Sequence, residues 1–192
     1  MKRLFAAIHI VPDPHFLSVF ADLKSRLRTE KIRWVEPQNM HITIKFFGET
    51  PFEKMIDIKQ VFKKSVTNLS PLKLTLKKTG IFGSRYKPRL IWFGIEENKQ
   101  LFALSNEIFS KLNETGFPID RQNFIPHLSL GRLKSVQNKI KFQQTIDLFR
   151  DVFVQDIKVD SITLFESKLH PDGVTYNAIE QYYLKEGSSW QE

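Results

Sequence analysis

The chain has 192 residues, of which 41% are hydrophobic and 26% charged, a composition typical of a globular protein with a substantial core. It contains no cysteine, which excludes disulfides, thiolate nucleophiles and cysteine-bound zinc or iron–sulfur sites. A net charge of +8 favours anionic partners such as nucleic acid or nucleotides, although a basic, solvated surface explains the same charge. The apolar run near the N-terminus is too short to span a membrane and lacks a small-residue cleavage site, so we expect a cytoplasmic protein.

Strands and helices alternate in the first half of the chain. Residues 3–10 predict a strand, and Pro14 opens a helix with an apolar stripe at helical spacing. Residues 32–37 and 40–47 predict two further strands. Thr50 and Pro51 are the expected N-cap and first turn of a second helix that runs to about Asn68. Its expected apolar face consists of Phe52, Ile56, Phe62 and Val66.

The second half of the chain continues the alternation. Residues 72–78 and 89–95 predict strands, and a helix over 97–115 is expected to stop at Gly116. Its predicted buried stripe is Leu101, Leu104, Ile108 and Leu112. Residues 126–132 predict a strand, and 136–149 a helix or lid. Residues 156–167 and 174–184 are expected to pair as a hairpin around the turn at 170–173.

The organisation of these elements favours an α+β fold. No Pro- or Ser-rich linker divides the chain, and the half-polar strands are typical of antiparallel sheets with one exposed face. The segments PQNMHITI and RQNFIPHLSL form a weak internal sequence repeat. We therefore expect residues 1–192 to form a single domain of two pseudo-symmetric lobes with mainly antiparallel sheets flanking a central cleft. Each lobe contributes one histidine-containing strand.

These two strands carry the candidate chemistry. Residues i and i+2 of a strand project from the same face, so His41 shares a face with Thr43, and His127 shares a face with Ser129. The alternate positions are apolar in both strands and are expected to enter the core. If the two polar faces meet, they form a site of two imidazoles and two hydroxyls.

Such a site suits a phosphodiester. Its hydrolysis needs one proton removed from water and one delivered to the departing oxygen, and imidazoles perform both transfers near neutral pH. The hydroxyls can donate hydrogen bonds to the non-bridging oxygens. No metal or cofactor is required by this scheme.

Other interpretations of the same residues remain. A single half-buried strand histidine is more often structural than catalytic. Neither triplet has the His-Glu-x-x-His spacing of a helical zinc site, and no carboxylate lies in either strand as a third ligand. Ser129 lacks the Gly-x-Ser-x-Gly turn of a serine nucleophile, and the chain has no glycine-rich phosphate loop.

The segments RWVEPQNMHITIKFFGE and FIPHLSLGR resemble the paired His-x-Thr motifs of the 2H phosphoesterase superfamily. Within it, the chain is most similar to the RNA 2′,3′-cyclic phosphodiesterase branch, also called 2′-5′ RNA ligase-like. The blocks RLFAAIHI, GIFGSRYKPRLIWFGI and LFESKLHPDGVTYNAI extend the resemblance over nearly the whole chain. It implies a bilobal fold and metal-independent hydrolysis of a terminal 2′,3′-cyclic phosphate to a 2′-phosphomonoester.

The resemblance also implies roles for individual residues. His41 would be the proton donor to the leaving 3′ oxygen, and His127 the proton acceptor that activates water. Thr43 and Ser129 would bind phosphate oxygens, Ser129 standing where Thr is usual in the family. Arg132 matches an arginine that often follows the second motif, but strict alternation turns it away from His127 unless the strand bends at Gly131.

Accessory residues are harder to assign from sequence. A basic stretch interrupted by Tyr86 is a candidate for RNA backbone contacts, or simply a solvated loop; its cations are Lys77, Lys78, Arg85, Lys87 and Arg89. Parity predicts Phe46 in the core and Phe47 on the cleft face. The remaining histidines, which lack a hydroxyl at i+2, are set aside as incidental: His9, His15 and His170.

The leading hypothesis is a monomeric enzyme acting on RNA with 2′,3′-cyclic phosphate ends or on small nucleotides. Alternatives within the class are 2′-5′ RNA ligation and hydrolysis of a small cyclic nucleotide. A different class, a non-catalytic RNA-binding module whose histidines only contact phosphate, would bind RNA tightly without turnover.

Overall fold

The structure is a computed structural model, and it describes residues 1–67, 69–119, 124–171 and 173–184. Its helices are α1 (Pro14–Arg26), the 3₁₀ turn η1 (Pro37–Asn39), α2 (Phe52–Val66), α3 (Lys99–Glu114) and α4 (Lys139–Leu148). Its strands are β1 (Lys2–His9), β2 (Lys31–Trp34), β3 (His41–Thr50), β4 (Leu72–Gly83), β5 (Pro88–Ile95), β6 (His127–Ser135), β7 (Phe153–Val159), β8 (Ser161–Leu169) and β9 (Val174–Tyr183). The α+β class expected from the sequence is confirmed.

The strands form a single sheet in which every pair is antiparallel. The order is β7-β4-β5-β6-β3-β1-β8-β9, and β2 pairs with β6 beside this path. The sheet has two halves, one around β1 and β3 and the other around β5 and β6. They join through one residue pair of β3 and β6, Ile42 opposite Leu128. The two histidine strands are therefore neighbours at the middle of the sheet.

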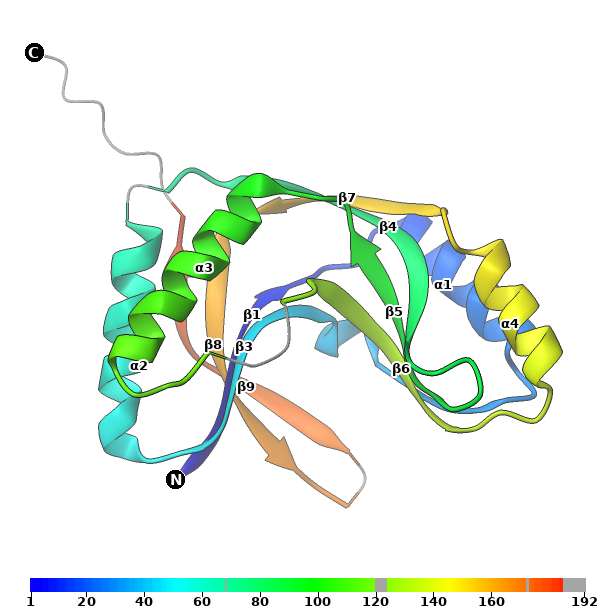
Figure 1. Cartoon of the computed structure of the whole chain (residues 1–192), viewed down its shortest axis with the longest axis horizontal. Coiled ribbons are helices and arrows are strands. Elements are labelled where there is room, and N and C mark those ends of the chain that lie inside the picture. Colours follow the sequence, from blue (N-terminus) through cyan, green and yellow to red (C-terminus); the bar gives the residue numbers. More distant parts are fainter. Residues whose placement is uncertain (68, 120–123, 172, 185–192) are drawn as a thin grey trace, which may run out of the picture.

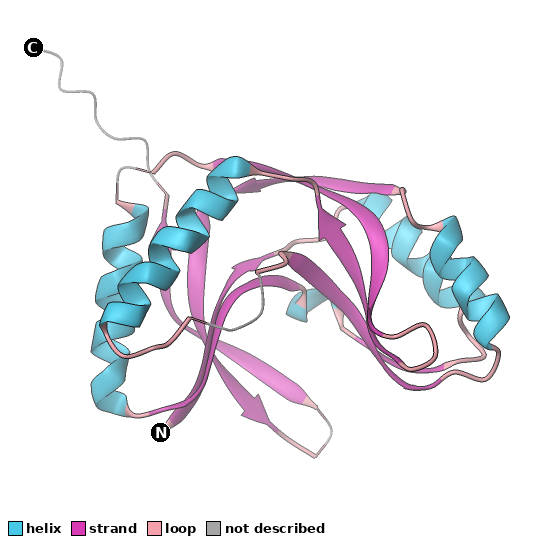
Figure 2. Ribbon diagram, viewed as in Figure 1, coloured by secondary structure: helices cyan, strands magenta, loops and turns pink. Residues whose placement is uncertain are grey.

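The sheet curls strongly from one end to the other (Figures 1 and 2). A single residue, Asp160, separates β7 from β8, yet β7 pairs with β4 and β8 pairs with β1 in opposite halves of the sheet. So short a link forces the two halves to bend toward each other. The strand predicted over 156–167 is therefore two strands, whereas the predicted hairpin partner of its second part, β9, is confirmed. Residue 172 of the predicted turn and residues 121–123 of the weak internal repeat lie outside the described residues.

The helices cover the outside of the curled sheet (Figure 2). Helix α2 packs against α3 and β9, whereas α1 packs near β7 and α4 near β4. The predicted stripe of α3 is buried, and Gly116 ends that helix with a left-handed φ of 90°. The prediction for α2 is partly wrong: Phe52 and Ile56 are 60% and 62% exposed. The buried face of α2 is instead Ile58, Val61, Phe62, Ser65 and Val66.

The start of α2 also differs from the prediction. Pro51, not Thr50, occupies the N-cap, and no side chain caps the helix. The Thr50 hydroxyl donates to the Gly48 carbonyl at 3.1 Å instead.

Bulges in β3 and β6 change the faces on which later residues lie. Along β3 the pairing with β1 skips Ile44, and along β6 the pairing with β5 skips Leu130. An extra residue in one strand reverses the alternation of side chains beyond it. The first seven positions of the two strands share one burial pattern: half-buried, buried, half-buried, buried, buried, exposed, half-buried. The histidine strands are thus equivalent in detail, bulge included.

No helix within the described residues is long and apolar enough to cross a membrane.

Gly131 is required by packing just beyond the bulge in β6. A Cβ built on Gly131 would lie 2.7 Å from Cγ2 of Ile32 and 2.8 Å from Cε3 of Trp34. Gly131→Ala is therefore expected to lower the free energy of unfolding by about 1–3 kcal/mol through overpacking. Urea unfolding measures the change, with Ser135→Ala at the exposed end of the same strand as the control. Equal stability of the two variants would contradict this packing.

Candidate active site

The site lies where β3 and β6 meet. Ile42 and Leu128 are fully buried and directly paired, so His41 and Thr43 flank one member of the pair, and His127 and Ser129 flank the other. Because the strands are antiparallel, His41 lies on the Ser129 side of the pair and Thr43 on the His127 side. The structure therefore brings the four predicted residues together around one point.

Both histidines are held by the same backbone contact. Nδ1 of His41 lies 2.7 Å from the carbonyl oxygen of Asn39, and Nδ1 of His127 lies 2.8 Å from that of Ile125. A carbonyl only accepts, so Nδ1 of each ring is the donor and carries a proton. Nε2 is then the nitrogen left for chemistry in each ring, and the contact fixes both tautomer and orientation.

Aromatic side chains pack against each imidazole. The ring of His41 lies 4.9 Å from Phe5 and 5.2 Å from Tyr176, centroid to centroid. The ring of His127 lies 4.7 Å from Phe82 in an edge-to-face arrangement and 6.4 Å from Trp92. These contacts limit the rotation of both rings and keep water from one side of each.

Burial sets the protonation of the histidines. It lowers the pKa of His41 below 6.5, and although the hydrogen bond to Asn39 opposes this change, the nearby charges of His9 and His127 add to it. Burial also lowers the pKa of His127, again opposed by its backbone hydrogen bond. In the absence of an anion, both imidazoles are therefore biased toward the neutral form.

The hydroxyls of Thr43 and Ser129 are half-buried and have no hydrogen-bond partner among the described residues. They are free to donate to a bound anion. Within the described part of the chain, no three His, Cys, Asp or Glu side chains gather closely enough to hold a metal ion.

The bulge in β6 brings Arg132 to the site. Arg132 pairs with Leu90, and Gly131 pairs with the buried Ile91, so the extra residue at Leu130 turns Arg132 onto the face of His127. The bend that a phosphate contact required is therefore present, one residue before Gly131. Burial raises the pKa of Tyr176, and the opposing charges on that phenol come first from Arg132 and then from Arg3 and Arg33. Three guanidinium groups thus lie within electrostatic reach of the Tyr176 phenol beside His41.

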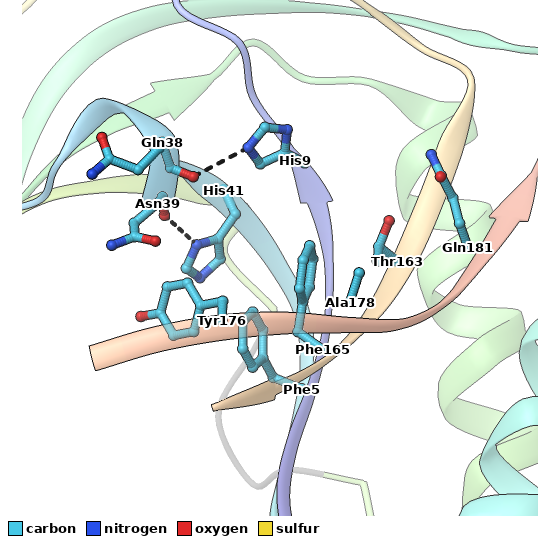
Figure 3. A pocket seen from close by; sticks show the side chains of 10 residues that line it. All are labelled: Phe5, His9, Gln38, Asn39, His41, Thr163, Phe165, Tyr176, Ala178 and Gln181. Atoms are coloured by element: carbon cyan, nitrogen blue, oxygen red, sulfur yellow. Dashed lines mark hydrogen bonds between the residues drawn. The ribbon is translucent and has the colours of Figure 1, made fainter. Parts of the chain in front are cut away.

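A pocket of ≈ 320 Å³ opens next to His41 (Figure 3). Phe5, Phe165 and Tyr176 form an aromatic wall, and polar groups of His9, Gln38, Asn39, Thr163 and Gln181 line much of the remainder. The lining residues of β1, β8 and β9 occupy paired positions on one face of the sheet: Phe5 opposite Phe165, Phe165 opposite Ala178, and Thr163 opposite Gln181.

The sequence analysis missed His9. It pairs directly with His41 across β1 and β3, and its Nε2 lies 3.3 Å from the carbonyl oxygen of Gln38. Parity along the first strand places His9 on the same face as Phe5, which was a usable signal, but the pairing with His41 was not visible from sequence. His15 and His170 lie elsewhere, against Phe153 and Thr175.

Two further predictions about faces are wrong. Phe46 is 48% exposed and lies under the guanidinium of Arg3, whereas Phe47 packs between Phe62 and Phe117 on the helix side. Each residue occupies the face predicted for the other, because the bulge at Ile44 reverses the alternation.

The basic stretch that was a candidate for RNA contacts, or else a solvated loop, does not lie in one place. Lys77 forms an ion pair with Glu96 at 3.0 Å from the middle of β4, whereas Arg85 and Lys87 belong to the turn that joins the end of β4 to β5. Tyr86 in that turn is 83% exposed.

Comparison with known proteins identifies the family. The sequence profile described as LigT like Phosphoesterase matches residues 10–92 and 94–176, so each match contains one His strand. The chain belongs to this family of 2H phosphoesterases and is an enzyme of the phosphoesterase class. A protein of Methanocaldococcus jannaschii named RNA 2′,3′-cyclic phosphodiesterase is 34% identical over 94% of this chain and 99% of its own length. A protein of the same name from Archaeoglobus fulgidus is 31% identical over the same shares of the two chains.

Solved structures show the same fold. TT0787 of Thermus thermophilus superposes with a TM-score of 0.79 at 22% identity, over 97% of this chain and 99% of that protein. E. coli LigT complexed with 3′-AMP superposes with a TM-score of 0.76 at 22% identity, over 96% and 98% of the two chains. These likenesses establish the curled, two-part sheet as the fold of the family.

The contact of His9 with the site predicts a shift in the pKa of His41. A charge on His9 disfavours protonation of His41, so His9→Ala is expected to raise the pKa of His41. NMR titration of the His41 imidazole measures the shift. His15→Ala, on the distant start of α1, is the control and should leave it unchanged. A His41 titration that is unmoved in His9→Ala would exclude this electrostatic coupling.

Proposed function

We propose that the protein hydrolyses the 2′,3′-cyclic phosphate at the end of an RNA chain, or of a nucleotide, to a 2′-phosphomonoester. The observation that carries the proposal is the matched pair of imidazoles, each fixed through Nδ1 so that Nε2 is left for proton transfer. The two relatives described above, which are 34% and 31% identical to this chain, are named RNA 2′,3′-cyclic phosphodiesterase, and these names support the same activity.

His41 and His127 divide the proton transfers. Water attacks phosphorus, and its proton passes to Nε2 of His127. The bond from phosphorus to the 3′ oxygen breaks, and that oxygen takes the proton of Nε2 of His41. The low pKa of His127 keeps it neutral and ready to accept. His41 must be protonated, and a bound phosphate anion, by its charge, favours this form.

The hydroxyls and arginines hold the phosphate. Thr43 and Ser129 donate to the non-bridging oxygens, and because neither has another partner among the described residues, they lose no protein contact in doing so. Arg132 adds a positive charge from the His127 strand. With the anion held by these groups and both protons moved by imidazoles, the proposed reaction uses no metal ion.

The division of roles also places the nucleoside. The leaving 3′ oxygen belongs to the ribose, which stays bound to phosphorus through its 2′ oxygen, so the sugar lies on the His41 side of the phosphate, opposite the attacking water. The pocket beside His41 has the mixed lining that a nucleoside requires, aromatic on one wall and polar on much of the rest. We assign the terminal nucleoside to this pocket.

Removal of either imidazole is expected to reduce kcat/KM by at least about 10², because each general acid or base contributes roughly that factor or more. The measurement uses His41→Ala and His127→Ala with EDTA-treated protein and an RNA that ends in a 2′,3′-cyclic phosphate. The expected product carries a 2′-phosphate. His15→Ala, at the start of α1 and outside both the pocket and the paired strands of the site, is the matched control.

A wild-type rate in either variant would contradict the assigned roles. Formation of a 3′-phosphate would contradict His41 as the donor to the 3′ oxygen. Tight, salt-dependent RNA binding without turnover would favour the non-catalytic alternative, and a ligated product the ligase alternative.

The pH dependence follows from the lowered pKa values. In the active form of the free protein, one imidazole is protonated and the other is neutral. This form is most populated between the pKa values of His41 and His127, both of which lie below 6.5. Above them both rings are neutral, so kcat/KM is expected to be higher near about pH 5.5 than near about pH 8. The profile of kcat extends to higher pH, because bound phosphate raises the pKa of His41. A kcat/KM maximum on the alkaline side would contradict this prediction.

A further inference from the structure

Four cations share the cleft face of the paired strands β2 and β6. Arg33 lies directly opposite Arg132, so both project from the face that Arg132 shares with His127. Lys31 lies two residues from Arg33 and Lys134 two residues from Arg132, on the same face. A second bulge leaves Lys134 unpaired between Leu133, the partner of Ile32, and Ser135, the partner of Lys31. These four residues form a cationic ladder with an inner and an outer rung.

The charges of the cationic ladder are available. All four residues are exposed, and none has an ion pair or a hydrogen bond with any other described residue. The neighbouring carboxylate of Glu30 forms no ion pair with these four described residues; it is buried and accepts hydrogen bonds from the backbone amides of Gln137 and Asn138. Four unpaired cations on one surface attract a polyanion.

A groove of ≈ 570 Å³ follows the ladder outward. It is lined by Lys31, Ile32, Arg33 and Lys134, and closed on one side by Pro171 in the β8–β9 hairpin. The hairpin passes close to the inner rung: a Cβ built on Gly173 would lie 3.4 Å from Nη2 of Arg33. The groove is therefore a shallow, open one, with a floor of strands and the hairpin along one side.

The inner rung adjoins the site of chemistry. Tyr176 contacts His41 and lies within electrostatic reach of both Arg132 and Arg33. The outer rung is two residues further along each strand, or roughly 6.6 Å, which separates it enough to hold a different phosphate. A chain that leaves the nucleoside pocket thus meets the inner rung first and the outer rung next.

From this geometry we infer that the groove binds the RNA chain on the 5′ side of the cyclic phosphate, and that the protein prefers oligonucleotide ends to cyclic mononucleotides. The inference rests on the proposed function, because it extends the same substrate beyond its terminal nucleotide. It assigns to Lys31 and Lys134 contacts with backbone phosphates, which set affinity and register but do not read sequence.

The experiment compares adenosine 2′,3′-cyclic phosphate with a pentaribonucleotide that ends in the same group. Wild-type protein is expected to have the higher kcat/KM for the pentanucleotide. In the double variant Lys31→Ala/Lys134→Ala, the ratio of the two kcat/KM values should fall about tenfold, about threefold for each exposed ion pair, mainly through KM. The slope of log KM against log salt for the pentanucleotide should decrease by about 1.4, since each single-strand phosphate contact contributes about 0.7.

The matched control is Lys63→Ala/Lys64→Ala, which removes the same charge from the last turn of α2, on the outer side of the sheet. It should keep both the ratio and the salt slope. If the ladder acted only through net charge, the two double variants would behave alike, and the inference would be wrong. Equal kcat/KM for both substrates in the wild type would also overturn it.

Failure of the proposed function would give a different result, namely no turnover of either substrate by wild-type protein. Fluorescence anisotropy with a labelled pentanucleotide ending in a 2′-phosphate then tests the groove independently. Binding that weakens in the Lys31/Lys134 variant and not in the control supports the groove; equal binding by the two variants overturns it.

Discussion

The site depends on one pair of buried residues. Ile42 and Leu128 are the paired residues of β3 and β6, and both are inaccessible to solvent. A paired position in an antiparallel sheet keeps the two Cα atoms within about 5.5 Å. Because each residue stands between a histidine and a hydroxyl, this single pair sets the spacing of all four groups. The one-residue link at Asp160 bends the two halves of the sheet around it.

The sequence predicted the faces of the two histidine strands correctly up to the bulges. Alternation correctly gave the faces of His41, Thr43, His127 and Ser129, because each strand is regular over those residues. It failed at Phe46 and Phe47, which exchanged faces beyond Ile44. A bulge is defined by pairing with another strand, so one strand's own sequence does not reveal it. The proposed contact of Arg132 depends on the equivalent bulge at Leu130, which only the pairing with β5 shows.

The two halves of the sheet do not correspond to the two halves of the chain, so the sequence did not reveal which distant segments lie side by side. Strand β1 and the β8–β9 hairpin, from opposite ends of the sequence, build the pocket beside His41. Strand β2 precedes β3 in sequence but pairs with β6, which places Arg33 opposite Arg132. His9 and the cationic ladder became visible only through these long-range pairings. The individual elements, by contrast, were mostly predicted from local periodicity and helix ends.

The matched strands carry unequal surroundings, and the inequality suits the proposed reaction. On the His41 side, the aromatic residues Phe5 and Tyr176 line an open pocket, which suits the nucleoside that carries the leaving 3′ oxygen. On the His127 side, Phe82 and Trp92 pack on the imidazole, and the indole lies so close over Gly80 that a Cβ there would be 2.2 Å from it. That tight packing suits a nucleophile as small as water. In the proposed reaction, the different packing beside each ring is what gives a symmetric pair of imidazoles its direction.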